Sequence, residues 1–415
     1  MQKQPFEAWK FTEFRWFILA RFSLTMAILM QSVLVGWLVY EYTKDPWKLG
    51  LTGLIEAIPT LVVALYGGYL ADIYSRKKII ITSIASLSLA SLLLSAYILY
   101  CQINEAVFAL TTIYVYVAIM GICRGFLSAS VSAFGAQLVP ISVYPNMISW
   151  SSSAWYMGAI MGPAIGGLIY AWFNPAVACF TFTALMFLAM CCYVMIASKP
   201  VANKLTEPLM QSLKSGIVYV YRNKILLSAI TLDLFAVLFG DAIVLLPAFA
   251  NDVLHIGAKE MGYLRAAPAL GALAMAVVLA YHPPLKNTGK KLLLAVAGFG
   301  LCMIVFALSK MFVLTFIILV VAGMLDNISV MIRSTILQLQ TPDNMRGRVA
   351  SINSIFIGSS NEIGSFVSGS MARAFTLIPS VIIGGLASIT VVAVTTWKAP
   401  KLLNYEIMER GNKLN

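Results

Sequence analysis

Long apolar runs separated by short polar breaks make up almost the whole chain. The runs cover residues 14–40, 48–71, 79–100, 106–134, 147–172 and 176–198 and, after a longer break, 225–250, 260–282, 290–309, 312–338, 350–374 and 378–397. A hydrocarbon core about 30 Å thick needs roughly 20 helical residues per crossing. The pattern therefore predicts an all-α membrane protein with twelve transmembrane helices.

The longest polar break falls almost midway along the 415-residue chain. Inside it, apolar residues recur at helical spacing at Leu209, Leu213, Ile217 and Val220, which indicates an amphipathic helix on the membrane surface. We therefore expect an N-terminal six-helix bundle (1–198), a cytoplasmic linker with this helix (199–224), a C-terminal six-helix bundle (225–400) and a cytoplasmic tail (401–415).

A weak internal repeat relates the two predicted bundles. With an offset of 202 residues, the matched positions are Pro140, Ser149, Ser152, Gly162 and Gly167 against Pro342, Ser351, Ser354, Gly364 and Gly369. With an offset of 209, Gly53 and Pro59 fall on Gly262 and Pro268. Two segments that agree at nearly the same offset favour duplicated halves, so we expect pseudo-symmetric bundles.

Composition excludes a water-soluble globule, since 60% of the residues are hydrophobic and only 11% are charged. The net charge of +12 comes from Lys and Arg at the ends of the runs, in every second loop. Positive-inside bias explains this pattern better than nucleic-acid binding does, and it places both termini in the cytoplasm. The expected partners are the lipid bilayer and a small-molecule substrate, with no nucleic acid.

Enzyme chemistry and metal binding find little support in the sequence. Only two His are present, and the six Cys show neither metal-ligand spacing nor a disulfide framework. No convergent nucleophile and base can be identified, so we expect no catalytic activity, metal or cofactor. No apolar region with a cleavage site precedes the first run, so a cleaved signal peptide is not expected.

Residues 67–78 place one acid and three cations between the second and third apolar runs. The segment resembles the loop between helices 2 and 3 of the major facilitator superfamily, although Ile73 and Ser75 depart from the pattern. The resemblance implies a conformational latch that packs near the start of helix 11, and the latch residues are then Gly68, Asp72, Arg76, Lys77 and Arg348. An ordinary basic topology loop is the alternative.

The fifth apolar run contains the residues Gly158, Gly162, Pro163, Gly166 and Gly167. Their spacing is similar to the Gly-x-x-x-Gly-Pro-x-x-Gly-Gly signature of antiporters of the same superfamily, which implies export. The alternative is a packing face, because small residues let helices approach closely and Pro permits a bend.

Ionisable residues inside apolar runs are costly in a membrane and are therefore functional candidates. A proton-driven exporter needs a carboxyl group that loads and releases a proton, and the candidates are Asp241, Asp326 and Glu362, with Glu56 and Asp233 after them. Buried ion pairs or helix caps are the alternative. We expect Asp326 and Arg333, seven residues apart, to share a helix face without pairing directly.

The guanidinium fork of Arg matches carboxylates, so arginines in the runs are candidates for binding an anionic substrate. They are Arg21, Arg124, Arg265 and Arg333, and pairing with a neighbouring acid is an equally open alternative. Trp155 and Tyr156 precede the glycine signature, where they line the cavity or anchor the helix at the interface.

Segments 232–240, 264–269 and above all 326–335 resemble the drug and siderophore exporters of the major facilitator superfamily. The resemblance implies a twelve-helix carrier that works by alternating access, with its substrate between the halves. We therefore predict a monomeric secondary transporter in a bacterial inner membrane that exports a siderophore or a related amphipathic molecule, driven by a proton gradient. A siderophore importer, a multidrug pump and a lipid flippase are the alternatives, and the cargo and coupling ion stay open.

Overall fold

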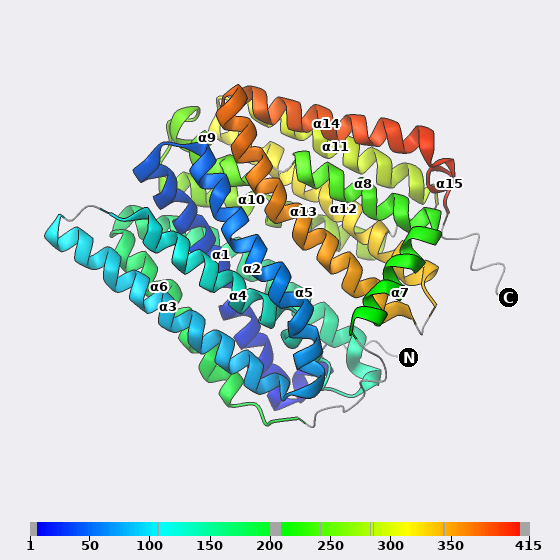
Figure 1. Cartoon of the computed structure of the whole chain (residues 1–415), viewed down its shortest axis with the longest axis horizontal. Helices are drawn as coiled ribbons and strands as arrows, with labels where there is room; N and C mark the ends of the chain where they lie inside the picture. Colours follow the sequence, from blue (N-terminus) through cyan, green and yellow to red (C-terminus); the bar gives the residue numbers. More distant parts are fainter. Residues whose placement is uncertain are drawn as a thin grey trace. The chain divides into compact units, whose positions relative to one another are not determined.

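The computed structural model describes residues 6–105, 108–199, 209–240, 242–282, 284, 286–342 and 345–406. Every regular element in these residues is a helix, and none is a strand. Eleven segments among them are long and apolar enough to cross a membrane (Figure 1). The chain is therefore an all-helical, multi-pass membrane protein.

The helices follow the predicted apolar runs to within a few residues. The first six spans are α1 (Thr12–Thr43), α2 (Pro46–Ile73), α3 (Arg76–Asn104), α4 (Leu110–Gly135), α5 (Tyr144–Trp172) and α6 (Pro175–Val194). The later spans are α8 (Lys224–Gly240) with α9 (Leu246–Asp252), α10 (Ala258–Tyr281), α11 (Thr288–Leu308), α12 (Phe312–Gln340) and α14 (Leu377–Lys398). The other helices are η1 (Ala8–Lys10), η2 (Ile141–Val143), α7 (Leu209–Arg222), η3 (Ile243–Leu245), α13 (Arg346–Phe375) and α15 (Pro400–Leu403).

The predicted twelfth crossing corresponds to α13. This helix has 30 residues, which is long enough to span, but residues such as Arg346, Arg348 and Glu362 make it more polar than the eleven apolar spans. Its crossing of the membrane stays a prediction.

The predicted seventh run is broken instead of continuous. α8 ends at Gly240, and the chain resumes in η3 and α9. Pro247 lies in the first turn of α9. Proline is tolerated there because the first N–H groups of a helix have no intrahelical partner.

The expectation that residues 67–78 form a polar turn is wrong in its extent. α2 continues to Ile73 and α3 begins at Arg76, so only Tyr74 and Ser75 connect them. The backbone of the predicted latch segment is therefore mostly helical.

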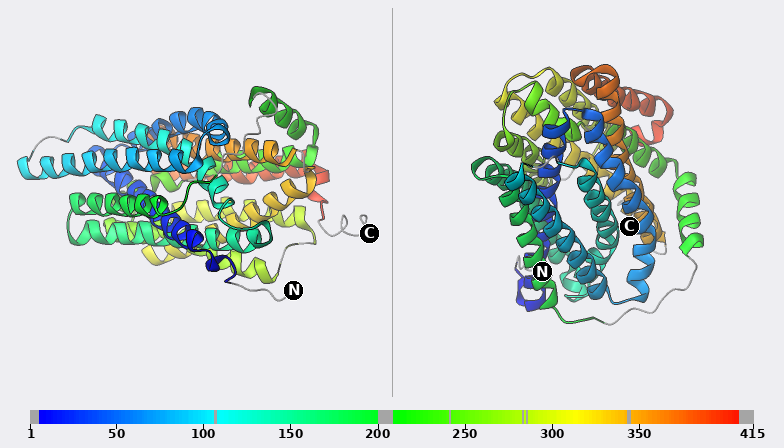
Figure 2. Two further views of the ribbon diagram at one scale, coloured as in Figure 1. Left: turned by 90° about the horizontal axis from the view of Figure 1, so that it is seen from below. Right: turned by 60° about the vertical axis from the view of Figure 1, so that its left-hand side comes forward.

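The chain forms two compact units. Unit 1 comprises Met1–Lys44, Ile55–Thr206 and Ile256–Ala266, and unit 2 comprises Asp45–Leu54, Glu207–His255 and Ala267–Asn415. Within unit 1, α1 packs against α5 and α6, and α3 packs against α4 and α6. Within unit 2, α11 packs against α12 and α14, and α8 packs against α13 and α14 (Figures 1 and 2).

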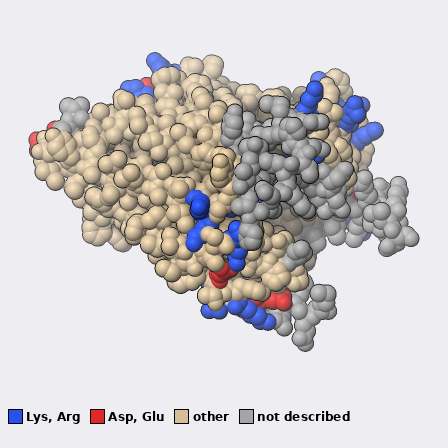
Figure 3. All heavy atoms as spheres, turned by 60° about the horizontal axis from the view of Figure 1, so that its bottom comes forward, with Lys and Arg blue, Asp and Glu red and all other residues tan. Residues whose placement is uncertain are grey.

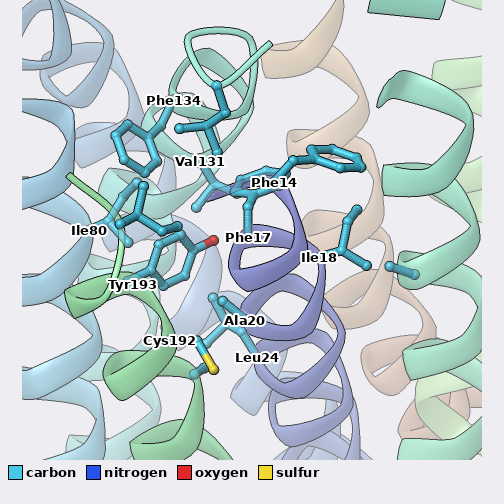
Figure 4. Close-up of a cluster of buried hydrophobic side chains, with 14 of the residues drawn as sticks. Phe14, Phe17, Ile18, Ala20, Leu24, Ile80, Val131, Phe134, Cys192 and Tyr193 are labelled. Carbon is cyan, nitrogen blue, oxygen red and sulfur yellow. The ribbon is translucent and has the colours of Figure 1, made fainter. Parts of the chain in front are cut away.

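Aromatic side chains from three helices meet in one core cluster of unit 1, shown in Figure 4. Phe17 of α1 meets Tyr193 of α6 edge to face, with ring centroids 6.3 Å apart, and Phe134 of α4 packs beside Tyr193. Interhelical hydrogen bonds supplement this packing, such as the 2.8 Å contact between the Ser91 and Tyr116 hydroxyls. Such bonds hold helices together where apolar surroundings supply little hydrophobic driving force.

Charged side chains are sparse on the face of the molecule shown in Figure 3. Uncharged residues cover most of what is visible there, and Lys and Arg occur in a few small groups. This distribution is typical of a surface that is largely in contact with lipid.

Both units contain a close contact between glycines of two helices. In unit 1, a Cβ added to Gly167 would lie 3.1 Å from the Cα of Gly262. In unit 2, a Cβ added to Gly50 would lie 2.9 Å from the Cα of Gly369. Gly369 matches Gly167 at the offset of 202, and Gly50 lies one turn before Gly53, which matches Gly262. Each unit therefore contains a close contact between glycines of two helices, and the duplication of the halves stays a prediction.

The predicted amphipathic helix corresponds to α7. Ile217 is exposed, whereas Val220 is buried in a core cluster of unit 2. A Cβ on Gly216 would come within 2.6 Å of Ile352 of α13, so α7 packs closely on that helix. Its position on the membrane surface stays a prediction.

Candidate transport site

Glu56 of α2 and Arg124 of α4 form an ion pair inside the membrane-spanning part of unit 1. The atoms in contact are Oε1 of Glu56 and Nη1 of Arg124. The Arg124 side chain is 36% exposed and that of Glu56 is 12% exposed. Ionisable groups at such positions are retained mainly where they pair or act in transport. This pair is buried on one side and open on the other.

Small residues of α4 bring the two charges together. A Cβ on Gly121 would collide with the Glu56 carbonyl oxygen, and one on Gly125 would lie 2.9 Å from the Thr60 carbonyl oxygen. The Thr60 hydroxyl contacts the carbonyl oxygens of Glu56, at 2.7 Å, and of Gly121, at 3.0 Å. The approach of the backbones places Arg124, between the two glycines, beside Glu56.

A second ion pair lies in unit 2, between Asp233 of α8 and Nη1 of Arg333 on α12. Their side chains are 9% and 4% exposed. This pair is almost fully removed from solvent, and each charge is compensated mainly by the other.

Arg124 and Arg333, both predicted to bind substrate, pair with acids, as the alternative interpretation allows. Half-buried Arg21 of α1 donates from Nε to the Ser151 carbonyl oxygen of α5 at 3.2 Å. Arg265 is half-buried on α10. A role for any of them in binding substrate stays a prediction.

The three acids ranked first in the sequence are described only in part. Asp326 of α12 and Glu362 of α13 are both half-buried. Asp241 lies outside the described residues. Glu56 and Asp233, which were ranked after them, each form an ion pair with an arginine.

The latch residues are only partly described. Gly68 and Asp72 lie near the end of α2, and their side chains are outside the described part of the structure. Arg76 donates to the Ala133 carbonyl oxygen at 3.2 Å, and Lys77 donates to that of Val194 at 2.8 Å. Arg348 donates to the Ser215 hydroxyl of α7 at 3.0 Å. The latch itself stays a prediction.

The glycine signature of α5 is a packing surface. A Cβ on Gly158 would lie 3.0 Å from the Met26 nitrogen of α1, and one on Gly162 would lie 2.5 Å from the Met26 carbonyl oxygen. Gly166 faces Met30 of α1 in the same way, and Gly167 faces α10. Small residues are thus required for packing here, whichever direction transport takes.

Trp155 and Tyr156 stack edge to face with centroids 5.2 Å apart, and Trp155 is 43% exposed. A polar residue that the sequence reasoning missed is Gln31 of α1, which is fully buried and donates to the Met120 sulfur of α4. Its Oε1 has no hydrogen-bond partner among the described residues. Gln31 was missed because the search followed charge, although a polar side chain in an apolar run is also a signal.

Among the described residues, the pair of Glu56 and Arg124 joins a mostly buried carboxylate to a guanidinium that is partly exposed. No group of three metal-ligating side chains occurs in the described ranges. A carboxylate beside a guanidinium can accept a proton or exchange partners, which are the elementary events of an ion-coupled carrier.

Comparisons with known proteins agree with this architecture. The Major Facilitator Superfamily pattern matches residues 17–365. The Enterobactin exporter EntS of Shigella flexneri is 26% identical over 376 residues, which cover 88% of this chain and 87% of that protein. EntS of Escherichia coli O1:K1 matches equally well.

Solved transporters share the fold at low sequence identity. A POT family transporter in complex with 5-aminolevulinic acid superposes with a TM-score of 0.78 at 11% identity, over 94% of this chain and 97% of that one. A bacterial homologue of the human lysosomal transporter Spinster gives 0.71 at 13% identity, over 97% of each chain. The helix pattern, the solved folds and the sequence match agree, and the chain belongs to the Major Facilitator Superfamily and resembles EntS.

Proposed function

We propose that this chain exports a siderophore, or a related amphipathic small molecule, in exchange for protons by alternating access. The observation that supports exchange is the ion pair of Glu56 and Arg124 within the spans of unit 1, whose arginine is partly exposed. The similarity to EntS, an enterobactin exporter by name, supports the cargo class. We also propose a monomer in a bacterial inner membrane with cytoplasmic termini, which needs no cofactor beyond the proton gradient.

Competition for one carboxylate explains the exchange. Ionised Glu56 accepts hydrogen bonds, so it can hold a cargo that presents hydroxyl donors, as a siderophore does before it binds iron. A proton on the same oxygen removes the charge that holds the donors, so proton and cargo exclude each other. Arg124 supplies a counter-charge when neither is bound. If the site faces the two sides of the membrane in turn, mutually exclusive binding becomes counter-transport.

Transport by purified protein in proteoliposomes under an imposed pH gradient tests the proposal. Three solutes are offered separately: a metal-free siderophore, its ferric complex and a lipophilic cationic dye. We expect the metal-free siderophore to move against the proton flux, and Glu56→Gln to abolish gradient-driven movement. Glu105→Gln is the matched control, because Glu105 is an exposed acid beyond the end of α3.

Other outcomes separate the alternatives. Inward movement of the ferric complex alone would identify an importer, and movement of the dye alone would identify a multidrug pump. Transfer of labelled phospholipid between leaflets without movement of any solute would identify a flippase. Normal exchange by Glu56→Gln would move the coupling role to another acid.

A further inference from the structure

A cleft of about 600 Å³ lies between α1 and α5 in unit 1. The first turns of α1 form one wall, where Trp16, Leu19 and Phe22 follow one another at helical spacing. Trp150 and Met157, two turns apart on α5, form the other. The lining is therefore mostly apolar and aromatic.

The short helix η1 closes one end of this cleft. The Ala8 N–H donates to Oδ1 of Asn146 at 2.9 Å, which fixes η1 next to the start of α5. The ring of Trp9 meets that of Trp150 edge to face at 5.0 Å, and both rings line the cleft. The closed end thus lies where the chain enters its first span.

The cleft leads from this end along α1 into the span. From Arg15 to Phe22 the helix rises about 10 Å at 1.5 Å per residue. Several lining side chains remain accessible: Trp16 is 38% exposed, Leu19 41% and Met157 50%. Figure 4 shows that Ile18, which also lines the cleft, points away from the core contacts of Phe17 and Tyr193. An extended apolar chain fits this shape.

Arg15 carries the positive charge of the cleft. Its side chain is exposed, and its Nε donates to the Trp9 carbonyl oxygen at 2.8 Å. That is the only hydrogen bond of its guanidinium within the described residues, and no acid there pairs with it. The terminal nitrogens of the fork can therefore bind a phosphate.

We propose that this cleft binds an anionic phospholipid, with its phosphate at Arg15 and one acyl chain along Leu19, Phe22 and Met157. Tryptophan rings at the end of a span lie at headgroup depth, which suits Trp9 and Trp16. The lining offers few hydrogen-bonding side chains to a polar cargo, and one of them, Ser153, already donates its hydroxyl to the Ser149 carbonyl oxygen. This site is separate from the Glu56 and Arg124 pair and does not depend on the proposed transport.

Native mass spectrometry of the purified full-length protein tests the proposal, by titration with dioleoyl phosphatidylglycerol or dioleoyl phosphatidylcholine. We expect one phosphatidylglycerol per chain, bound about fivefold more tightly than phosphatidylcholine, which corresponds to one cation near the headgroup. Arg15→Gln should remove this preference, and Arg15→Lys should retain most of it. Met157→Trp, which fills the apolar part, should weaken the binding of both lipids.

Lys398→Gln is the matched control, because Lys398 is an exposed cation in the last turn of α14 in unit 2. It should leave the preference unchanged. The proposal is overturned if Arg15→Gln binds phosphatidylglycerol as the parent does, or if Lys398→Gln loses as much. Displacement of the lipid by metal-free siderophore, with that displacement lost in Met157→Trp, would assign the cleft to cargo instead.

Discussion

The ion pairs of the two units have the same chemistry and different surroundings. Arg124 of α4 pairs with Glu56 of α2, and Arg333 of α12 pairs with Asp233 of α8. Arg124 is 36% exposed, whereas Arg333 is 4% exposed.

This difference separates a structural pair from one that can exchange partners. A pair removed from solvent is hard to open, because each charge would be left in a medium of low dielectric constant. Arg124, which is partly exposed, can be hydrated while Glu56 binds a proton or a cargo. We therefore propose that the pair of Asp233 and Arg333 holds α8 and α12 together. For the pair of Glu56 and Arg124 we propose a role in coupling transport to protons.

Arg333→Met should have the largest effect on stability, because it leaves Asp233 as an uncompensated buried charge. We expect a loss of about 3–5 kcal/mol, seen as a lower unfolding temperature of the purified protein and less protein in the membrane. The double variant Asp233→Leu with Arg333→Met should recover much of this, because no lone charge remains. If the single variant is as stable as the parent, the structural role of this pair is wrong.

Gly121→Ala tests whether the close approach of α2 and α4 keeps Glu56 and Arg124 paired. The new Cβ would collide with the Glu56 carbonyl oxygen, so we expect overpacking to cost about 1–3 kcal/mol and reduce exchange. Gly358→Ala is the control, because within the described residues the new Cβ would have no atom of another helix within 4 Å. Equal unfolding temperatures for the two variants would contradict the packing argument.

Glu56→Gln tests whether the pair of Glu56 and Arg124 serves transport more than stability, unlike the pair of Asp233 and Arg333. Because Arg124 is partly exposed, it can be hydrated after its partner is neutralised, so we expect a stability loss of only about 1 kcal/mol or less. Gradient-driven exchange should nevertheless be lost. Thermal unfolding and proteoliposome transport on one preparation separate the two effects, and unfolding as severe as that of Arg333→Met would remove the distinction.

Thr60→Val should have the smallest effect. It removes the hydroxyl that contacts the carbonyl oxygens of Glu56 and Gly121, and such bonds between membrane helices contribute about 0.6 kcal/mol. Thr52→Val is the control, because the one hydrogen bond of the Thr52 hydroxyl in the described part of the chain goes to the Leu49 carbonyl oxygen of its own helix. A larger loss for Thr52→Val would show that the interhelical bond is unimportant.

Much of the fold could be predicted from the sequence. Runs of apolar residues mark helices in a bilayer, because every backbone polar group there must be satisfied within its own segment. That rule placed the helix boundaries, and the glycine spacing in α5 indicated a close helix contact before its partner was known. The family followed from short motifs whose spacing survives at low identity.

The sequence alone determined where helices form and which charges lie inside them, because both follow from the local cost of exposing polar groups to lipid. Only the tertiary structure decided which charges meet. Arg333 pairs with Asp233, a hundred residues away, and the sequence could not choose between such partners. Burial was likewise undetermined, because the exposure that distinguishes Arg124 from Arg333 depends on how neighbouring helices pack around each side chain.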